Sequence, residues 1–358
     1  MAISSPVSQR IAMLRTTMIF GVVLLHTPDE LGVDRIDFQN AFHLIRAFFQ
    51  EAVFRATVPL LSLISGYLLF SAGLDLVPGK LYKKKIKSLG LPFFFFNVVL
   101  AALMYGIEKA TGWAPWYQMS EMSRMELVNG FYSVSAYPFN FPLYFIRDLL
   151  VVTLLVPLFG LFIRHAPVIG LAAVATVFYG NFDGDLVLRF SIPIFVYVGG
   201  LAAVYRWDLT AADRYALPCF AVFLCGAAAI VAFRITDIAW FVFTAPFLVW
   251  PAASRLVHTR YGKWAQANSN SSFFIFCAHA PLQMVPYYIY RHNTDVLPEA
   301  VHWFGSFGIC IVVLLGVHRL AMRTMPRTFA LMTATRLPKP APAPVQAAPD
   351  AAAVKLTA

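Results

Sequence analysis

Long apolar runs separated by short polar segments recur along the whole chain. The runs are continuous rather than alternating, which favours helices over strands, and most of them are long enough to cross about 30 Å of hydrocarbon. They predict ten transmembrane helices, at residues 11–27, 47–70, 88–107, 141–163, 167–181, 186–205, 215–233, 236–257, 271–290 and 300–322. The shortest of these segments is the fifth, 167–181.

This pattern predicts an all-α polytopic membrane protein. Hydrophobic residues make up 59% of the 358 residues and charged residues 13%, whereas a soluble domain has about 25% charged residues. We divide the chain into a cytoplasmic N-terminus at 1–10, a ten-helix membrane domain at 11–325 and a tail at 326–358. The tail is rich in Pro and Ala from Leu337 onward, so we expect it to be cytoplasmic and disordered.

The formal net charge of +10 agrees with one orientation of these helices. With the N-terminus inside, nineteen of the 28 Lys and Arg residues fall in inner segments, and six fall in outer segments: Arg35, Arg46, Lys109, Arg124, Arg234 and Arg291. Cytoplasmic segments of membrane proteins carry such an excess of basic residues. We therefore expect both termini in the cytoplasm, and the lipid bilayer rather than a nucleic acid as the partner.

Two other groups of residues have ordinary interpretations. The four cysteines fall in apolar runs without metal-site spacing, so we interpret them as buried free thiols: Cys219, Cys225, Cys277 and Cys310. The longest outer segment, 108–140, carries several aromatic residues: Trp113, Trp116, Tyr117, Tyr132 and Tyr137. These rings suit a belt at the membrane interface, which we favour, or a surface that binds sugar.

Arg15 and His26 form the most informative pair of polar residues in the apolar runs. They are separated by ten residues in RTTMIFGVVLLH, so both side chains leave the same face of a helix, about 16 Å apart along its axis. No small-x-small cleavage site follows, which indicates a retained first span rather than a signal peptide. We expect Arg15 at the inner edge of the membrane and His26 near the outer edge.

Other ionisable residues also interrupt the predicted spans. Glu51 and Arg55 are four residues apart on one helix face, Arg147 and Asp148 lie together in the fourth span, and His279 lies in the ninth. Each has a structural alternative, because a lone His often packs or hydrogen-bonds and an Arg–carboxylate pair often neutralises itself. Together they are hard to explain by packing alone, since charges inside a membrane are costly and usually functional.

The chemistry of these side chains favours acyl transfer. A neutral imidazole can take a proton from a sugar hydroxyl, and arginine binds the phosphates or the carbonyl of an acyl-CoA. The nucleophile elbow, the dinucleotide-binding glycine motif, the P-loop and the zinc-binding HExxH motif are all absent from the sequence. We expect no metal and no bound cofactor, with acyl-CoA as a co-substrate.

Four segments resemble motifs of the membrane acyltransferase 3 family, in the family's order. The first is the Arg-x10-His of Arg15 and His26. The second is FRATVPLLSLISGYLLF, with Arg55, Pro59, Ser65, Gly66 and Tyr67. The third is FPLYFIRDLLVV, where Tyr144 replaces the usual Trp and precedes Phe145, Arg147 and Asp148. The fourth is SSFFIFCAHAPL, with Ser272, Phe273, His279 and Pro281.

The resemblance implies a ten-helix enzyme of the bacterial inner (cytoplasmic) membrane. Such enzymes move an acyl group, often acetyl or succinyl, from acetyl-CoA or succinyl-CoA to a hydroxyl of an extracytoplasmic glycan. It implies catalytic roles for His26 and His279 and acyl-CoA binding by Arg15, Arg55 and Arg147. Supporting roles fall to Glu51, Asp148 and Ser65.

The chain resembles the members that act without an SGNH esterase-like domain. Their acceptors include exopolysaccharides, periplasmic glucans, lipid-linked sugars and cellulose, so we expect a polysaccharide or lipid-linked sugar acceptor and a polysaccharide-synthesis complex as a partner. Two alternatives remain open. A transporter or flippase of lipid-linked sugars would also use intramembrane charges, but the internal repeats of many transporters are absent. A non-catalytic scaffold of a polysaccharide-export complex is the other.

Overall fold

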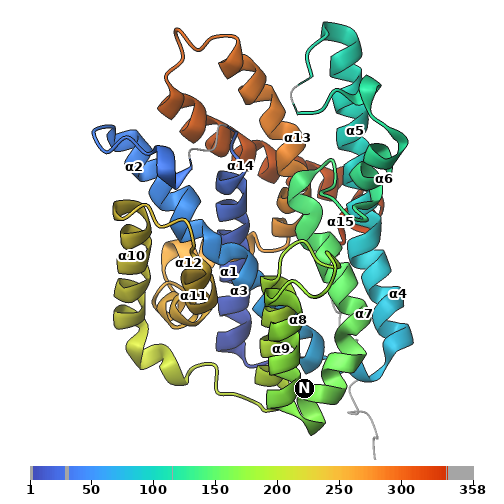
Figure 1. Ribbon diagram of the computed structural model, residues 1–358, viewed down its shortest axis with the longest axis vertical. Coiled ribbons are helices and arrows are strands. Elements are labelled where there is room, and N and C mark those ends of the chain that lie inside the picture. The colour runs from blue at the N-terminus through green and yellow to red at the C-terminus, as the bar shows by residue number, and fades with distance from the viewer. Residues whose placement is uncertain (1–2, 29–31, 115, 336, 338–358) are drawn as a thin grey trace, which may run out of the picture.

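The computed structural model describes residues 3–335 apart from 29–31 and 115, together with residue 337. Within these residues the regular secondary structure is all helical, as predicted, and there is no strand. Figure 1 shows the helices gathered in one bundle, with α1 running through its middle. The α-helices are α1 Ser5–Leu25, α2 Ala41–Ala47, α3 Thr57–Ser71, α4 Pro78–Lys85, α5 Leu91–Thr111, α6 Arg124–Tyr132, α7 Tyr144–His165, α8 Pro167–Tyr179, α9 Ser191–Val204, α10 Ala216–Ala232, α11 Ala239–Ala252, α12 Arg260–Ala267, α13 Ser272–Arg291, α14 Glu299–Thr324 and α15 Pro326–Thr333.

Each of the ten predicted segments contains a helix. In the described part of the chain, six helical stretches are long and apolar enough to cross a membrane: Ser5–Leu25, Ala41–Ser71, Pro78–Thr111, Phe141–His165, Ala211–Ala232 and Glu299–Thr324. A seventh arises if α11 and α12, which meet at a bend of 111°, count as one broken span. Helices α8 and α9 are apolar but shorter. The protein is therefore a multi-pass helical membrane protein.

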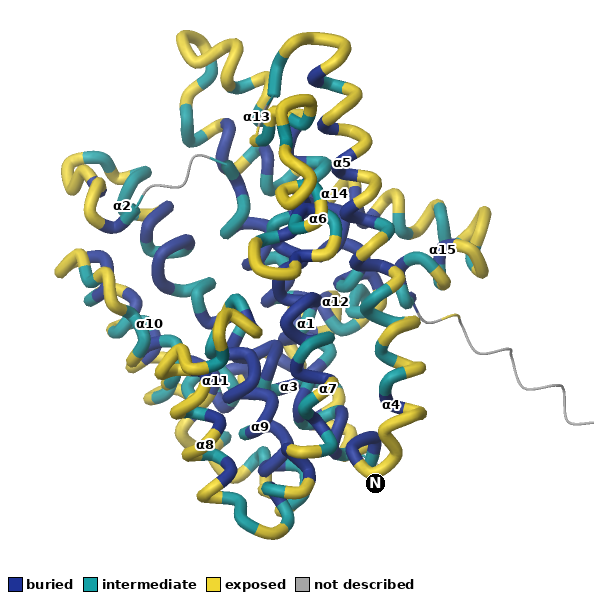
Figure 2. Tube along the Cα trace, turned by 45° about the vertical axis from the view of Figure 1, so that its right-hand side comes forward, coloured by how far each residue is buried: buried dark blue, intermediate teal, exposed yellow. Residues whose placement is uncertain are grey.

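The buried centre of the bundle is formed by α1, α3 and α9, where Figure 2 concentrates the buried residues. Two glycines let α3 and α9 approach backbone to backbone. A Cβ on Gly66 would lie 2.2 Å from the carbonyl oxygen of Val196, and a Cβ on Gly199 would lie 2.2 Å from that of Leu63. The Gly66 of the second motif is thus explained by packing.

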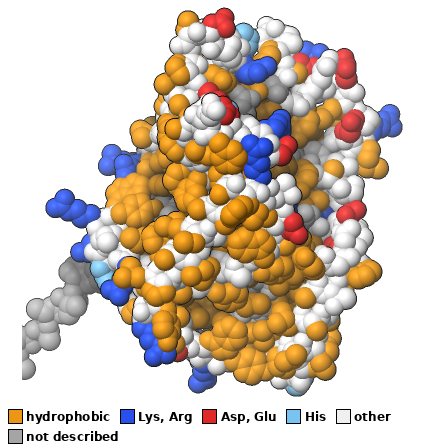
Figure 3. Space-filling model, turned by 60° about the vertical axis from the view of Figure 1, so that its left-hand side comes forward, with side chains coloured by type: hydrophobic (Ala, Val, Ile, Leu, Met, Phe, Trp, Pro, Cys, Tyr) orange, Lys and Arg blue, Asp and Glu red, His pale blue; other side chains and the backbone are white. Residues whose placement is uncertain are grey.

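The outer surface of the bundle is apolar. Exposed hydrophobic side chains include Leu217 and Val222 on α10, and Val312 and Leu320 on α14. On the face drawn in Figure 3, hydrophobic side chains form a broad band, with charged side chains above it and along its edges. An apolar band of this kind is the surface that a membrane protein presents to lipid.

The structure corrects two expectations. Residues 326–333, predicted as the start of a disordered tail, form α15, because Phe329 packs against Phe274 and becomes buried. The tail beyond Leu337 lies outside the described residues. The four cysteines are free, but Cys225 is exposed and Cys219 half-buried, since α10 lies at the edge of the bundle.

Candidate active site

His26 stands directly after the last residue of α1. The helix was predicted to reach Thr27 but ends at Leu25, because Pro28 disfavours helical backbone in the residue before it. The His26 backbone N–H donates to the carbonyl of Val22 at 3.1 Å, and the imidazole Nδ1 is 2.8 Å from the same oxygen. A carbonyl only accepts, so Nδ1 carries a proton and the neutral ring keeps Nε2 as its acceptor.

A buried glutamine, Gln50, holds the end of α1 from one side. Its Nε2 donates to the carbonyl of Leu24 at 3.0 Å and lies within 3.5 Å of the carbonyls of Leu25 and Thr27. Its own Oε1 accepts from Arg46 Nε at 3.0 Å, and the Arg46 guanidinium also binds the Glu299 carboxylate. Gln50 therefore ties the segment around His26 to α2 and to the start of α14.

A second buried glutamine, Gln283, holds the same helix end from α13. Its Nε2 donates to the carbonyl of Val23 at 2.9 Å and to Thr27 Oγ1 at 3.2 Å. The last four carbonyls of a helix have no partner within it. In α1 these four carbonyls, from Val22 to Leu25, accept hydrogen bonds from His26, Gln283 and Gln50. Thr27 adds its backbone N–H to the Leu24 carbonyl and its hydroxyl to the Val23 carbonyl, so the backbone around His26 is bonded from several sides.

His279 approaches His26 from α13. The side chain is fully buried, and its Nδ1 lies 2.7 Å from the carbonyl of Phe276. The two imidazole centroids are 5.5 Å apart. Among the described residues, His279 Nε2 has no hydrogen-bond partner. Both rings thus bind backbone carbonyls through Nδ1 and keep an Nε2 lone pair in the neutral form.

The proline of the fourth motif helps to locate His279. Pro281 lies inside α13 and has no N–H to offer the carbonyl of Cys277. Asn140 Nδ2 donates to that carbonyl at 3.0 Å, and the Asn140 backbone N–H donates to Asn97 Oδ1 at 3.0 Å. This part of α13 is therefore bonded to Asn140, just before α7, and through it to α5.

His26 lines a cavity whose walls are mostly aromatic. The cavity has a volume of about 460 Å³ and is lined by His26, Thr27, Pro28, Trp116, Tyr117, Phe139, Phe141, Pro142, Ala280 and Tyr287. We call it the aromatic cavity. Its size lies within the usual range for small-molecule sites, and its lining contains no Lys, Arg, Asp or Glu.

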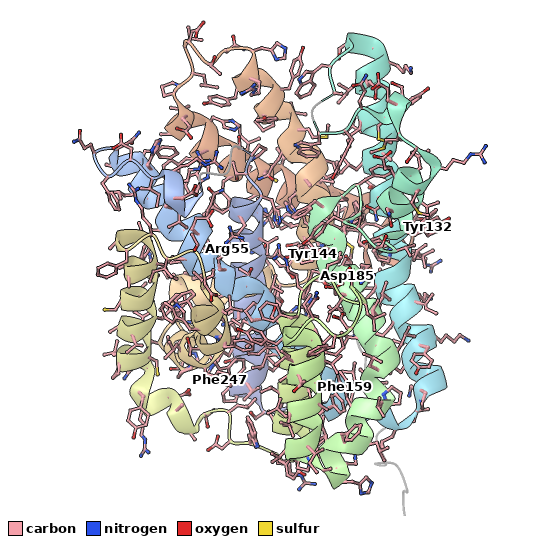
Figure 4. The ribbon with its side chains drawn as sticks, in the orientation of Figure 1. Arg55, Tyr132, Tyr144, Phe159, Asp185 and Phe247 are labelled. Atoms are coloured by element: carbon pink, nitrogen blue, oxygen red, sulfur yellow. The ribbon has the colours of Figure 1, made fainter. Side chains whose placement is uncertain are left out.

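A second cavity, which we call the charged cavity, holds the predicted pair Glu51 and Arg55. Its volume is about 380 Å³, and Arg189, Asp237 and Tyr144 also line it. Arg55 Nη2 donates to Glu51 Oε2 at 2.6 Å, which confirms the predicted pair. Figure 4 shows Arg55 and Tyr144 at nearly the same level of the bundle.

A narrow gap lies between these two cavities at His26 and shares lining residues with both. It has a volume of about 20 Å³ and is lined by His26, Thr57, Val58 and Tyr144 among others. The last three of these also line the charged cavity. The Arg189 guanidinium lies over the Tyr144 ring, 5.5 Å from its centroid. His26 consequently lies between an aromatic and a charged compartment.

Arg147 and Asp148 have structural partners. Arg147 donates to the carbonyls of Ser133 and Val134, both at 2.8 Å, and to that of Leu186. It also pairs with Asp148 at 3.0 Å. With its donors bonded to backbone, Arg147 is better placed to hold together the segments around Ser133 and Leu186 than to bind acyl-CoA.

The remaining predicted residues lie away from the histidine pair. Arg15 is half-buried on α1, about 16 Å before His26 along the helix axis, where Thr16 Oγ1 bonds the Ala265 carbonyl of α12 at 2.8 Å. Ser65 donates to the carbonyl of Leu61 on its own helix at 2.7 Å. Neither residue lines the cavities at His26.

The sequence analysis missed Gln50 and Gln283. Each has a signal in the sequence, because Gln50 lies four residues after Arg46 and Gln283 lies four residues after His279, on the same helix face. A neutral amide in an apolar run attracts less notice than a charge. Within the described residues, no group of three or more His, Cys, Asp and Glu side chains is arranged to hold a metal ion.

Comparison with known proteins agrees with this geometry. Residues 9–319 match the sequence model of a protein family described as an acyltransferase domain. The chain is 30% identical, over 349 residues, to the succinoglycan biosynthesis protein ExoH of Rhizobium meliloti (strain 1021), and the match covers 92% of this chain and 93% of that protein. No solved structure shows a significant match.

Proposed function

The chain belongs to the membrane acyltransferase family, and from this premise we propose that it moves an acyl group from cytoplasmic acyl-CoA to a sugar hydroxyl outside the bacterial inner membrane. The acceptor we propose is an exopolysaccharide, because a relative that matches nearly end to end is named for succinoglycan biosynthesis. Acetyl-CoA and succinyl-CoA are the proposed donors. We also propose that the chain crosses the membrane ten times, with both termini in the cytoplasm.

The observation that carries this proposal is the pairing of half-buried His26 with fully buried His279. Both rings are fixed through Nδ1 to backbone carbonyls, and their centroids are 5.5 Å apart. A base held in one tautomer and one orientation is ready to accept a proton without reorganisation. His26 lines the aromatic cavity and the narrow gap beside the charged cavity, so its ring can be reached by a substrate.

In the proposed reaction, His26 Nε2 takes the proton of the acceptor hydroxyl. The hydroxyl oxygen then attacks the thioester carbonyl, and the new C–O ester bond forms as the C–S bond breaks. The proton passes from His26 to the leaving thiolate, so free CoA and the glycan ester are the products. His279 orients this histidine or shares its proton. Transfer through an acyl-imidazole on His26 would give the same products.

The arginines divide the remaining work. Arg55 approaches the thioester oxygen from the charged cavity and stabilises its developing negative charge. Arg15 binds the CoA phosphates near the inner end of α1, because a guanidinium forms charge-assisted hydrogen bonds to phosphate oxygens. Arg147, because its donors are bonded to backbone, shapes the outer segments and does not bind acyl-CoA.

The family assignment weighs against the transporter and scaffold alternatives. The histidine pair has no evident task in a flippase, and a scaffold has no need of a ring pair whose Nε2 atoms are left for other partners.

His26→Ala tests the proposal directly. We expect ester groups on the extracellular polysaccharide to fall below about 1% of wild type, the loss of more than 100-fold that removal of a general base produces. Mass spectrometry of the purified polysaccharide measures the ester, and immunoblotting confirms an unchanged protein level.

The matched control is His292→Ala. His292 also follows the last residue of its helix and has Nδ1 2.9 Å from the carbonyl four residues earlier, but its side chain is exposed. This variant should keep wild-type acylation. Near-normal esterification in His26→Ala would refute acyl transfer by this site.

A further inference from the structure

We propose that the aromatic cavity is the subsite for one sugar ring of the acceptor, with Trp116, Tyr117 and Tyr287 as the surfaces on which the ring stacks. This inference rests on the proposed function and assigns one side of the His26 site to the acceptor. The occupant is a neutral pyranose ring that presents a hydroxyl to His26.

The rings of the cavity are held in fixed positions. Tyr117 packs edge-on against Phe139, with centroids 5.9 Å apart, and Phe141 packs edge-on against His26 at 5.8 Å. Aromatic side chains lose little conformational freedom on binding, so a set of them makes a rigid surface. Pyranose rings have apolar C–H faces that suit such surfaces and a rim of hydroxyls that suits His26.

Polar atoms in the cavity match a hydroxylated ligand. Burial raises the pKa of Tyr117, which keeps its phenol protonated and able to donate a hydrogen bond. Thr27 adds a hydroxyl beside His26. Trp116 is 36% exposed, so the wall that it forms extends to the surface of the protein.

The same cavity is a poor site for the acyl donor. Coenzyme A carries phosphates, which proteins bind with Arg, Lys or a helix N-terminus. The lining of the aromatic cavity contains no Lys, Arg, Asp or Glu, whereas that of the charged cavity contains Arg55, Arg189, Glu51 and Asp237. The uncharged lining of the aromatic cavity therefore suits a neutral ring and offers no group to bind the phosphates.

The arrangement also distinguishes these rings from a membrane-interface belt. A belt would turn Trp and Tyr toward lipid headgroups. Trp116 and Tyr117 instead line the cavity that contains His26, while Trp113 packs on Tyr288 at 4.7 Å outside that lining. The segment 108–140 thus supplies two tryptophans in different surroundings, one for a test and one for its control.

The test compares Trp116→Ala and Tyr287→Ala with Trp113→Ala in the full-length protein reconstituted into lipid. The acceptor is an oligosaccharide mixture from the polysaccharide of a strain that lacks the gene, with acetyl-CoA and succinyl-CoA as donors. We expect the acceptor KM to rise about tenfold or more in the first two variants. Trp113→Ala should match wild type, and the KM for acyl-CoA should stay within about twofold throughout. Trp116→Phe should recover most of the lost affinity.

The substitution Ala239→Phe tests the alternative that the sugar binds in the charged cavity, because the larger side chain would fill part of that cavity. Ala239 lines the charged cavity. A raised acceptor KM in Ala239→Phe, with Trp116→Ala and Tyr287→Ala unchanged, would place the sugar in the charged cavity and overturn this inference. Wild-type kinetics in all of these variants, while His26→Ala is inactive, would overturn it and leave the proposed function standing. Full activity of His26→Ala would instead refute the proposed function itself.

Discussion

Asp148 is a fully buried carboxylate whose partners include the segment that carries Arg189. Its oxygens accept from the backbone N–H of Leu188 at 3.0 Å and of Arg189 at 2.9 Å, and it pairs with Arg147 at 3.0 Å. A buried carboxylate is tolerated when its lone pairs are satisfied in this way. The residue therefore fixes the backbone at Arg189, beside the Tyr144 ring.

Asp148→Asn should destabilise the protein. The amide keeps the size of the side chain but leaves the buried Arg147 guanidinium without its counter-charge and replaces one acceptor oxygen by a donor. Breaking a buried ion pair in this way costs about 3–5 kcal/mol. Thermal unfolding of the detergent-solubilised protein should show a clear fall in Tm.

Asp185→Asn is the control for that measurement. Asp185 lies on the same outer segment, but its side chain is exposed, so its substitution should leave the Tm within error. Equal Tm values for the two variants would show that the Asp148 contacts contribute little to stability.

At the residue scale, the sequence indicated the ionisable side chains of the candidate site more readily than the neutral residues that support them. His26, His279 and the Glu51–Arg55 pair were recognisable because ionisable side chains are rare in apolar runs. Arg147 shows the limit of this reasoning, since its value as a ligand or as a support depends on which carbonyls surround it. Those carbonyls belong to Ser133, Val134 and Leu186, and only the folded chain brings them together.

At the scale of elements, the end of α1 receives hydrogen bonds from two other elements, the π-helical turn Phe48–Ala52 and α13. Gln50 and Gln283 are each 1% exposed and donate to carbonyls in the last turn before His26. Without them the Leu24 and Val23 carbonyls would keep only the bonds from the Thr27 N–H, at 3.2 Å, and the Thr27 hydroxyl, at 3.3 Å, and two strong donors to this turn would be lost. Since His26 Nδ1 bonds Val22 in this turn, a shift of the turn would move its ring.

The substitutions Gln50→Leu and Gln283→Leu should therefore move the His26 ring out of its catalytic position. We expect each to lower kcat about tenfold to 100-fold while both KM values stay within about threefold, because a small misplacement of a catalytic group affects the chemical step first. Initial rates with varied acyl-CoA and varied acceptor separate these quantities.

Gln266→Leu provides the matched control. Gln266 also donates an amide hydrogen bond to a backbone carbonyl, that of Val257 at 2.7 Å, but it lies in α12 and lines none of the cavities at His26. It should keep the wild-type kcat. If the Gln50 and Gln283 variants lose Tm and keep kcat, these side chains stabilise the fold without positioning His26.

The helical stretch Ala41–Ser71 shows why the shape of an element was harder to predict than its existence. The apolar run indicated one span at 47–70, and a continuous helical stretch is found there. Its middle is nevertheless a π-helical turn at Phe48–Ala52 followed by a 3₁₀ turn at Val53–Ala56. Such departures from α geometry follow from tertiary contacts, here Gln50 bonding α1 and Phe54 packing on Gly21, which periodicity does not encode.

For the molecule as a whole, apolar length predicted the helices but does not settle how many cross the membrane. Helices α8 and α9 have 13 and 14 residues, so each is about 20 Å long, short of the roughly 30 Å of hydrocarbon. Helices α8 and α9 could be arranged in two ways. Each could cross the membrane with the help of the connection between them, or the two could form a hairpin that enters and leaves on one side. Sequence length alone leaves both arrangements open.

The hydrogen bonds of the α8–α9 connection favour two crossings. Arg147 bonds the carbonyl of Leu186, and Asp148 accepts from Leu188 and Arg189, so the connection is bonded to the first turns of α7. The last residue of α7, His165, lies about 26 Å away along its axis, and α8 begins two residues later at Pro167. Helix α8 and the connection together therefore run back along most of the length of α7.

This geometry predicts that residue 185 faces the outside if the N-terminus is cytoplasmic. In a variant with its native cysteines replaced, Asp185→Cys should react with a membrane-impermeant maleimide on intact cells, as should Arg124→Cys in the outer segment. Lys84→Cys, in the basic helix α4, should react only after permeabilisation. Labelling of residue 185 that requires permeabilisation would mean that the start of α7, to which this connection is bonded, also faces the cytoplasm. The ten-crossing topology would then have to be given up.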